Sequence, residues 1–392
     1  MKRMFREYMD IFWTATKLGL TSFGGPVAHL AYFRDEYIEK KKWLTEKMYA
    51  DLIALCQFLP GPASSQVGIS IGMIRGGLLG GILSWLGFTL PSVLILIAFA
   101  LFLQGTSIDT SGFIHGLKIV AVAVVAHAIL GMAKKLTPDR PRIFIAMISA
   151  TIMLLVPSAI VQFGVIVAAG LIGYFLYRKE TNEIDGEAPV LFSKKVGVLA
   201  FTLFFLLLFG LPFWRTMAPN MSLALFDTFY RVGSTVFGGG HVVLPMLERE
   251  LVPHGFLTEE EFLAGYGAAQ AVPGPLFTLS SYLGMVISGS TGALVATIGV
   301  FLPSFLLLVG VLPFWNSIRE RTGFRAPLLG VNSAVVGLLI AAFYDPVFTS
   351  AIRNEVDFVI AMLAFSYLMF WKGTPWKVVL GTVLISVLMT FV

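Results

Sequence analysis

The chain alternates between long apolar segments and short charged segments. The segment 262–318 contains no Asp, Glu, Lys or Arg, and about 20 apolar residues are enough for one membrane-spanning helix. Apolar segments predict spanning helices at 78–104, 113–133, 142–157 and 159–177, and again at 290–313, 327–344, 356–371 and 376–392. The pattern therefore predicts an all-α polytopic membrane protein that lies in a lipid bilayer.

Composition supports a membrane protein and excludes several other classes. Of the 392 residues, 57% are hydrophobic and 13% are charged, whereas soluble domains carry about 25% charged residues. The single Cys56 excludes a disulfide framework within the chain, and the sequence has no Walker-type loop and no paired-histidine zinc motif. We therefore expect no cofactor, no metal and no nucleotide hydrolysis. The net charge of +5 is attributed to membrane topology and not to nucleic-acid binding.

Three short motifs of the first half return in the same order in the second half. TSFGGP at 21–26 returns as TVFGGG at 235–240, QFLPGP at 57–62 as QAVPGP at 270–275, and GFTLPS at 87–92 as GVFLPS at 299–304. The offsets of 214, 213 and 212 residues are too regular for chance. The chain is therefore predicted to contain two copies of one repeat, at 1–180 and 218–392.

The copies are joined by residues 181–217, which predict a polar linker followed by one extra transmembrane helix at 196–214. If each copy crosses the membrane an even number of times, this additional crossing turns the second copy upside down. Repeats of inverted topology are typical of secondary transporters.

Each copy also contains two apolar stretches broken by Gly or Pro, at 8–38 and 46–75 and at 222–247 and 259–286. They can be re-entrant hairpins or full crossings, and both keep the repeats inverted. Hairpins place the N-terminus and nearly all Lys- and Arg-rich loops in the cytoplasm, where positive loops concentrate. A half-helix of about 13 residues also rises only about 20 Å, too little for a core of about 30 Å. We therefore favour hairpins and a cytoplasmic N-terminus.

The breaks are candidate binding sites, because proline interrupts a helix and irregular backbone at membrane depth needs protein or a polar cavity beside it. After each break a new helix begins, and its first N–H groups lack intrahelical partners and attract anions. With inverted symmetry, the four half-helix tips could converge near the bilayer midplane. The candidates for substrate binding at these breaks are Gly24, Gly25, Gln57, Gly61, Ser64, Ser65, Gly238, Gly239, Gly240, His241, Gln270, Gly274, Thr278 and Ser281.

Two cations precede the glycine motifs at equivalent positions. Lys17 and Arg231 each lie six residues before the Phe of their motif, and ionisable residues inside a membrane are functional candidates. The alternative is that either side chain extends to the membrane surface. Gln57 and Gln270, which open the proline motifs, either contact the ligand or satisfy carbonyls that the breaks leave free.

Proton coupling has two candidates, Asp51 and His241. The alternative for Asp51 is an ion pair with Lys47. Glu36 and Glu250 match across the copies, but each lies in a charged stretch, so both are expected on solvated faces.

Through the doubled FGG and QxxPGP motifs quoted above, the chain resembles the chromate ion transporter (CHR) family over essentially its whole length, as a long two-domain member. The resemblance implies export of chromate, a tetrahedral dianion similar to sulfate, and hence chromate resistance. It also implies a multi-pass protein of the bacterial inner (plasma) membrane. The first copy departs from the second, because Pro26 stands where the second copy has Gly240 followed by His241. Equal roles for the two glycine motifs are therefore not implied.

Other functions share some of these features. A transporter of sulfate or another anion would differ only in its pocket, and an anion channel would lack saturation and counterflow. A membrane enzyme would need a carboxylate or metal cluster at membrane depth, and the charge-free segment 262–318 argues against one. Sulfate as a second substrate and assembly into a homodimer stay open.

Overall fold

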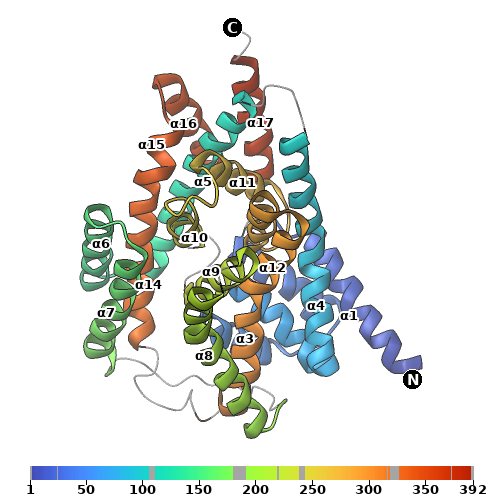
Figure 1. Cartoon of the computed structure of the whole chain (residues 1–392). Helices are drawn as coiled ribbons and strands as arrows, with labels where there is room; N and C mark the ends of the chain where they lie inside the picture. The colour runs from blue at the N-terminus through green and yellow to red at the C-terminus, as the bar shows by residue number, and fades with distance from the viewer. Residues whose placement is uncertain are drawn as a thin grey trace. The chain divides into compact units, whose positions relative to one another are not determined.

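The computed structural model describes residues 2–23, 25–105, 111–179, 191–218, 220–237, 243–315, 317, 326–371 and 373–389 (Figure 1). Within these ranges the regular secondary structure is helical, without a strand. Six of the described helices are long and apolar enough to cross a membrane, and Pro375–Met389 is a shorter apolar helix. The prediction of an all-α polytopic membrane protein is confirmed.

The chain divides into two compact units, each built from several segments. The first unit contains Met1–Ile95, Glu180–Gly240 and Pro273–Phe324, and the second contains Leu96–Lys179, His241–Val272 and Arg325–Val392. Each unit therefore draws on both sequence copies. The boundaries at 180 and 218 stay a prediction about the sequence repeats, and the compact units are not divided at these two points alone.

The first unit holds the broken stretches of the first copy and the glycine motif of the second. Its elements are α1 (Lys2–Thr21), α2 (Gly25–Phe33), the π-helix η1 (Arg34–Lys40), α3 (Glu46–Phe58), most of α4 (Ala63–Gly105), α8 (Lys194–Met217), α9 (Met221–Thr235), and the 3-10 turn η3 (Leu276–Thr278), α12 (Leu279–Val311) and the 3-10 turn η4 (Leu312–Phe314). Helix α3 ends two residues before Pro60, because proline disfavours helix in the residue that precedes it. Helix α8 covers the extra transmembrane segment predicted at 196–214.

Helix α4 is a helical hairpin and not one straight rod. Gly77 has a φ of +61°, and the backbone of Gly72 lies against that of Gly80. Residues eight apart in a straight helix would be about 12 Å apart along its axis, so the chain reverses at this corner. The same corner recurs in α12 at Ser288 and Gly289. The spans predicted to begin at 78 and 290 therefore begin at these two corners.

Glycines bring the helices of the first unit into close contact at equivalent positions of the two copies. Gly19 of α1 faces the backbone carbonyl of Phe88 in α4, and Gly233 of α9 faces that of Val300 in α12. Small residues permit such close approach between helices in a bilayer. Helices α9 and α12 accordingly lie side by side (Figure 1).

The second unit exchanges helices between the copies. Its elements are the end of α4, α5 (Ser111–Leu136), α6 (Arg140–Leu155), α7 (Ala159–Tyr177), α10 (Val243–Leu251), α11 (Glu259–Ala271), α14 (Ala326–Ala342), the π-helix η5 (Phe343–Phe348), α15 (Thr349–Ala351), α16 (Glu355–Phe370) and α17 (Pro375–Met389). Helix α14 of the second copy packs on α6 and α7 of the first (Figure 1). Helix α5 of the first copy packs on α16 and α17 of the second. The exchange explains why neither copy forms a compact unit alone.

Candidate functional site at the broken helices

In the first unit the breaks of one copy contact the breaks of the other. The N–H of Gly61, in the first Pro-Gly-Pro motif, donates a hydrogen bond to the carbonyl of Val236 at 2.7 Å. The N–H of Gly274, in the second Pro-Gly-Pro motif, donates to the carbonyl of Ser22 at 2.9 Å. Ser22 and Val236 immediately precede the Phe of each glycine motif. Two equivalent hydrogen bonds thus join each proline break to the glycine break of the other copy.

A serine from a long helix lies against each of these two glycines. A Cβ atom added to Gly61 would lie 2.7 Å from the Oγ of Ser304 in α12, and one added to Gly274 would lie 2.7 Å from the Oγ of Ser92 in α4. Sequence reasoning gave these serines no role. The signal that could have found them was the repeated LPS that closes the third motif.

The first turn of α4 carries three buried polar side chains. Ser64, Ser65 and Gln66 are 3%, 2% and 0% exposed. The Nε2 of Gln66 donates to the carbonyl of Pro60 at 2.7 Å and to Ser304 Oγ at 3.3 Å, so this side chain bridges the break and α12. The Oγ of Ser64 lies 3.2 Å from Nδ1 of the buried His29. Ser65 Oγ has no hydrogen-bond partner among the described residues.

The first turns of η3 and α12 are built differently, although they follow the equivalent break. Thr278 Oγ1 donates to the carbonyl of Pro275 at 2.7 Å, and Ser281 Oγ donates to the carbonyl of Thr278 at 2.7 Å. Both hydroxyls are buried and are used within their own turn. The two predicted helix tips are therefore not equivalent in their side chains.

The other residues predicted to bind substrate at the breaks differ in their backbone conformation and burial. Gly25 begins α2 with a φ of +81°. Gln57 is exposed, whereas Gln270, in the second unit, is partly buried and its Nε2 has no hydrogen-bond partner in the part of the chain that is described. Five predicted residues lie outside the described residues, namely Gly24, Gly238, Gly239, Gly240 and His241.

Lys17 belongs to an ion-pair cluster around a buried carboxylate. Its Nζ lies 2.8 Å from Glu36 Oε2, and Lys40 Nζ lies 3.3 Å from the same oxygen. The side chain of Glu36 is only 7% exposed, while that of Lys17 is 55% exposed. The expectation of a solvated Glu36 was wrong, because the sequence pattern of a charged stretch does not show that two lysines, one of them on α1, neutralise a buried carboxylate.

Glu36→Gln is expected to lower thermal stability at neutral pH and to reduce acid sensitivity. Burial alone would raise the pKa of Glu36, which lies in η1 outside the spanning helices, but hydrogen bonds and charge from Lys17 and Lys40 hold the pKa below its usual 4.5. Such a carboxyl contributes stability above its unfolded pKa, and the contribution is lost as the pH falls through the folded pKa. Thermal unfolding between pH 7 and pH 3 tests this, with the exposed Glu39→Gln as control. Parallel loss of stability in wild type and Glu36→Gln would contradict it.

Arg231 is also paired. Its Nη2 lies 2.9 Å from Asp227 Oδ2, and Arg215 Nη1 lies 3.4 Å from the same oxygen. Asp227 is 2% exposed, and the side chains of Arg231 and Arg215 are about one-third exposed. Sequence reasoning did not single out Asp227, although its spacing of four residues from Arg231 on one helix was the available signal.

Comparison with known proteins identifies the family. A family model described as chromate transporter matches residues 9–174 and 223–387, which is most of the chain and both repeats. The chain belongs to the chromate transporter family. It is a long member in which the matched domain occurs twice, so the resemblance seen in the motifs is confirmed.

Relatives of similar length support this family. An uncharacterized transporter of Methanocaldococcus jannaschii is 29% identical over 345 residues, which cover 87% of this chain and 84% of the relative. A chromate transport protein of Pseudomonas aeruginosa is 27% identical over 385 residues, or 94% and 88% of the two chains. A chromate transport protein of Cupriavidus metallidurans is 26% identical over 356 residues, or 89% and 84%. No solved structure matches the chain significantly. These relatives are named as transporters and not as enzymes.

Asp51 makes a contact across the copies of this chromate transporter family member. It is 3% exposed, and its Oδ1 accepts a hydrogen bond from Trp315 Nε1 at 3.2 Å. The indole belongs to the residue that follows η4, the 3-10 turn after α12 in the second copy. Among the described residues, no group of three or more His, Cys, Asp and Glu could hold a metal ion.

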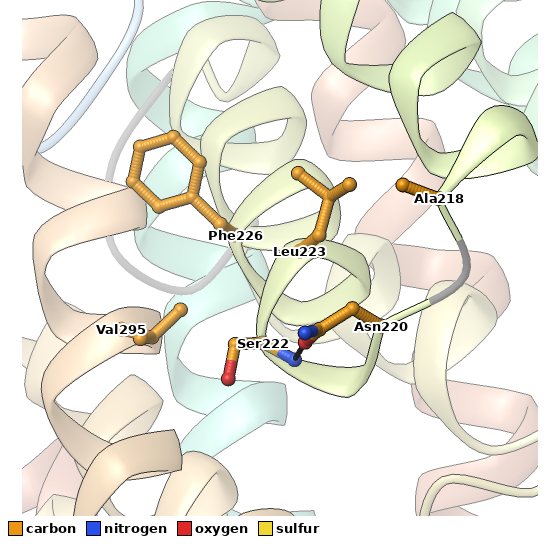
Figure 2. A pocket seen from close by; sticks show the side chains of 6 residues that line it. All are labelled: Ala218, Asn220, Ser222, Leu223, Phe226 and Val295. Atoms are coloured by element: carbon orange, nitrogen blue, oxygen red, sulfur yellow. Dashed lines mark hydrogen bonds between the residues drawn. The ribbon is translucent and has the colours of Figure 1, made fainter.

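A pocket of about 410 Å³ lies at the far end of α9 (Figure 2). It is lined by Ala218, Asn220, Ser222, Leu223, Phe226 and Val295, and the Ser222 N–H donates to the Asn220 side chain that caps α9. Because α9 has 15 residues, its two ends are about 20 Å apart. The pocket is therefore remote from the break at Val236 and is mostly apolar, so we do not assign it to anion binding.

Proposed function

We propose that this protein is a secondary transporter that exports chromate from the bacterial cytoplasm, with the anion bound at half-helix N-termini near the bilayer midplane. The observation that carries the proposal is the pair of hydrogen bonds from Gly61 to Val236 and from Gly274 to Ser22. Each joins the proline break of one copy to the glycine break of the other, in a chain of the chromate transporter family. Helix N-termini with free N–H groups then supply positive potential without a full charge.

The membrane potential can drive such export. Moving one charge across 100 mV is worth about 2.3 kcal/mol, so a dianion that leaves an inside-negative cell gains about 4.6 kcal/mol. We place the N-terminus in the cytoplasm and the two repeats in inverted orientation. Alternating access would then rock the repeats about the joined breaks.

Uptake of labelled chromate into inverted membrane vesicles tests the proposal. Inverted vesicles expose the cytoplasmic face, so an exporter loads them with chromate. We expect saturable uptake that follows an imposed membrane potential and exceeds that of vesicles without the protein. Uptake without saturation or counterflow would indicate a channel, and displacement by sulfate at far lower concentration would indicate a different natural anion.

Asp51→Asn is expected to preserve chromate uptake at a fixed pH but to abolish the response of uptake to an imposed pH gradient. The asparagine oxygen can still accept the hydrogen bond from Trp315, so the fold is kept, while the group can no longer exchange a proton. Uptake at several pH gradients measures the effect. The control is Asp10→Asn, a half-buried carboxylate of the same unit that pairs with Lys41. An unchanged gradient response in Asp51→Asn would remove this residue from coupling.

A further inference from the structure

We propose that the anion binds at only one of the two proline breaks, at the first turn of α4, and that the equivalent turn of η3 and α12 is a closed structural element. The inference rests on the proposed function and places the anion site in the first of the two sequence copies. Each chain would then bind one tetrahedral oxyanion.

The first turn of α4 has donors that the described residues do not use. The N–H of Gln66 makes the first intrahelical bond, to the carbonyl of Pro62 at 2.9 Å, so the N–H groups of the three residues before it lie ahead of the helical ladder. Ser65 Oγ is buried without a partner among the described residues. An unsatisfied hydroxyl in a protein interior is costly and calls for a ligand or water.

His29 adds a second buried polar group at the same turn. It is 1% exposed, and its Nδ1 lies 3.2 Å from Ser64 Oγ. Its Nε2 is buried with no partner of hydrogen-bond geometry in the described part of the chain, although the Ser22 carbonyl lies close by. When the Ser64 hydroxyl donates to Nδ1, the ring proton sits on Nε2, next to the Ser22 carbonyl. Ser65 is therefore the side-chain donor that we assign to the anion, and His29 orients Ser64 beside it.

Gln66 is a positioning residue in this arrangement. Its amide nitrogen is held by the carbonyl of Pro60 and by Ser304 Oγ. The side chain thereby fixes the break against α12. Its Oε1 has no partner among the described residues and can accept a hydrogen bond from water or from a protonated anion.

The second copy has lost these groups. At an offset of 213 residues, Phe277 replaces Ser64 and Leu279 replaces Gln66, and at the offset of 214 Val243 replaces His29. Phe277 is buried, with its ring 6.1 Å from that of Phe301. The hydroxyl of Thr278, at the position of Ser65, is already bonded to the Pro275 carbonyl. Apolar side chains and internal hydrogen bonds therefore occupy most of the second tip, where the buried Ser280 hydroxyl is the side-chain group left without a partner among the described residues.

Equilibrium binding of labelled chromate and, separately, labelled sulfate to the purified full chain tests the inference. We expect one anion per chain. Ser65→Ala should weaken binding about tenfold to hundredfold, the usual effect of losing a hydrogen bond to a charged group. The matched control Thr278→Val removes the hydroxyl at the equivalent position, and Ser280→Ala removes a buried hydroxyl that also has no described partner. Both controls should change binding less than threefold.

Several outcomes would overturn the inference. They are two anions per chain, equal weakening by Ser65→Ala and Thr278→Val, or no binding of either anion to the wild type. If Ser65→Ala does not fold, Ser65→Cys replaces it, because a thiol of similar size is only a weak donor, and unchanged binding by that variant counts against the inference. A failure of the proposed function would give a different result. Vesicles would then take up no chromate, while sulfate binding to the purified protein would still be weakened by Ser65→Ala.

Discussion

Gly61→Ala is expected to abolish chromate uptake and to lower the melting temperature of the purified protein. Gly61 has a φ of +118°, a conformation that side chains rarely adopt and that costs about 1–3 kcal/mol. The new Cβ would also lie 2.7 Å from Ser304 Oγ and 2.8 Å from Gln66 Nε2. The backbone would have to shift, and the hydrogen bond to Val236 would be strained or lost.

The repeat supplies a matched test of this first prediction. Gly274→Ala creates the same conflict, with a φ of +101° and Ser92 Oγ at 2.7 Å, so it should be similarly damaging. Gly210→Ala is the control, because Gly210 lies in α8 with open space around it. That change should be neutral or slightly stabilising, since alanine is favoured over glycine within a helix by roughly 0.5–1 kcal/mol. Wild-type uptake and stability in Gly61→Ala would show that the junction of the breaks is not needed.

The positions of the helices could be predicted because they depend on local properties of the chain. Length and hydropathy placed the spans, and proline placed the ends of α3 and α11. The position of the corner in α4 was predicted, because the span was expected to begin at 78 and the corner lies at Gly77. What was missing was the contact between Gly72 and Gly80, which shows that the chain reverses there.

The partners of the site residues could not be predicted, because they come from distant parts of the chain. The repeat showed that Gly61 and Gly274 are equivalent, but not that each bonds to the other copy's glycine motif. Nor does a charged stretch show that Glu36 is buried between two lysines. The repeat also suggested two equal helix tips, and it took the hydrogen bonds of Ser64 and Thr278 to show that their side chains differ.

Arg231→Gln is expected to abolish chromate uptake and to lower stability, and the two effects can be separated. Asp227 is 2% exposed and is held by Arg231 through contacts at 2.9 and 3.3 Å. Removing one partner of a buried pair typically costs 3–5 kcal/mol. Because Arg215 still lies 3.4 Å from the carboxylate, we expect a loss of about 3 kcal/mol or less, measured by denaturant or thermal unfolding.

The double variant Asp227→Asn, Arg231→Gln decides whether Arg231 acts on the anion or only on Asp227. It removes both charges, so no buried carboxylate is left short of a partner and stability should return toward that of the wild type. Uptake should stay lost if the guanidinium attracts the oxyanion, and recovery of uptake would show that Arg231 only supports the fold. The control is Asp139→Asn, Arg142→Gln, which neutralises an ion pair at the start of α6 and keeps a side chain that can cap that helix. Its uptake should remain that of the wild type, because this pair lies in the second unit, outside the joined breaks.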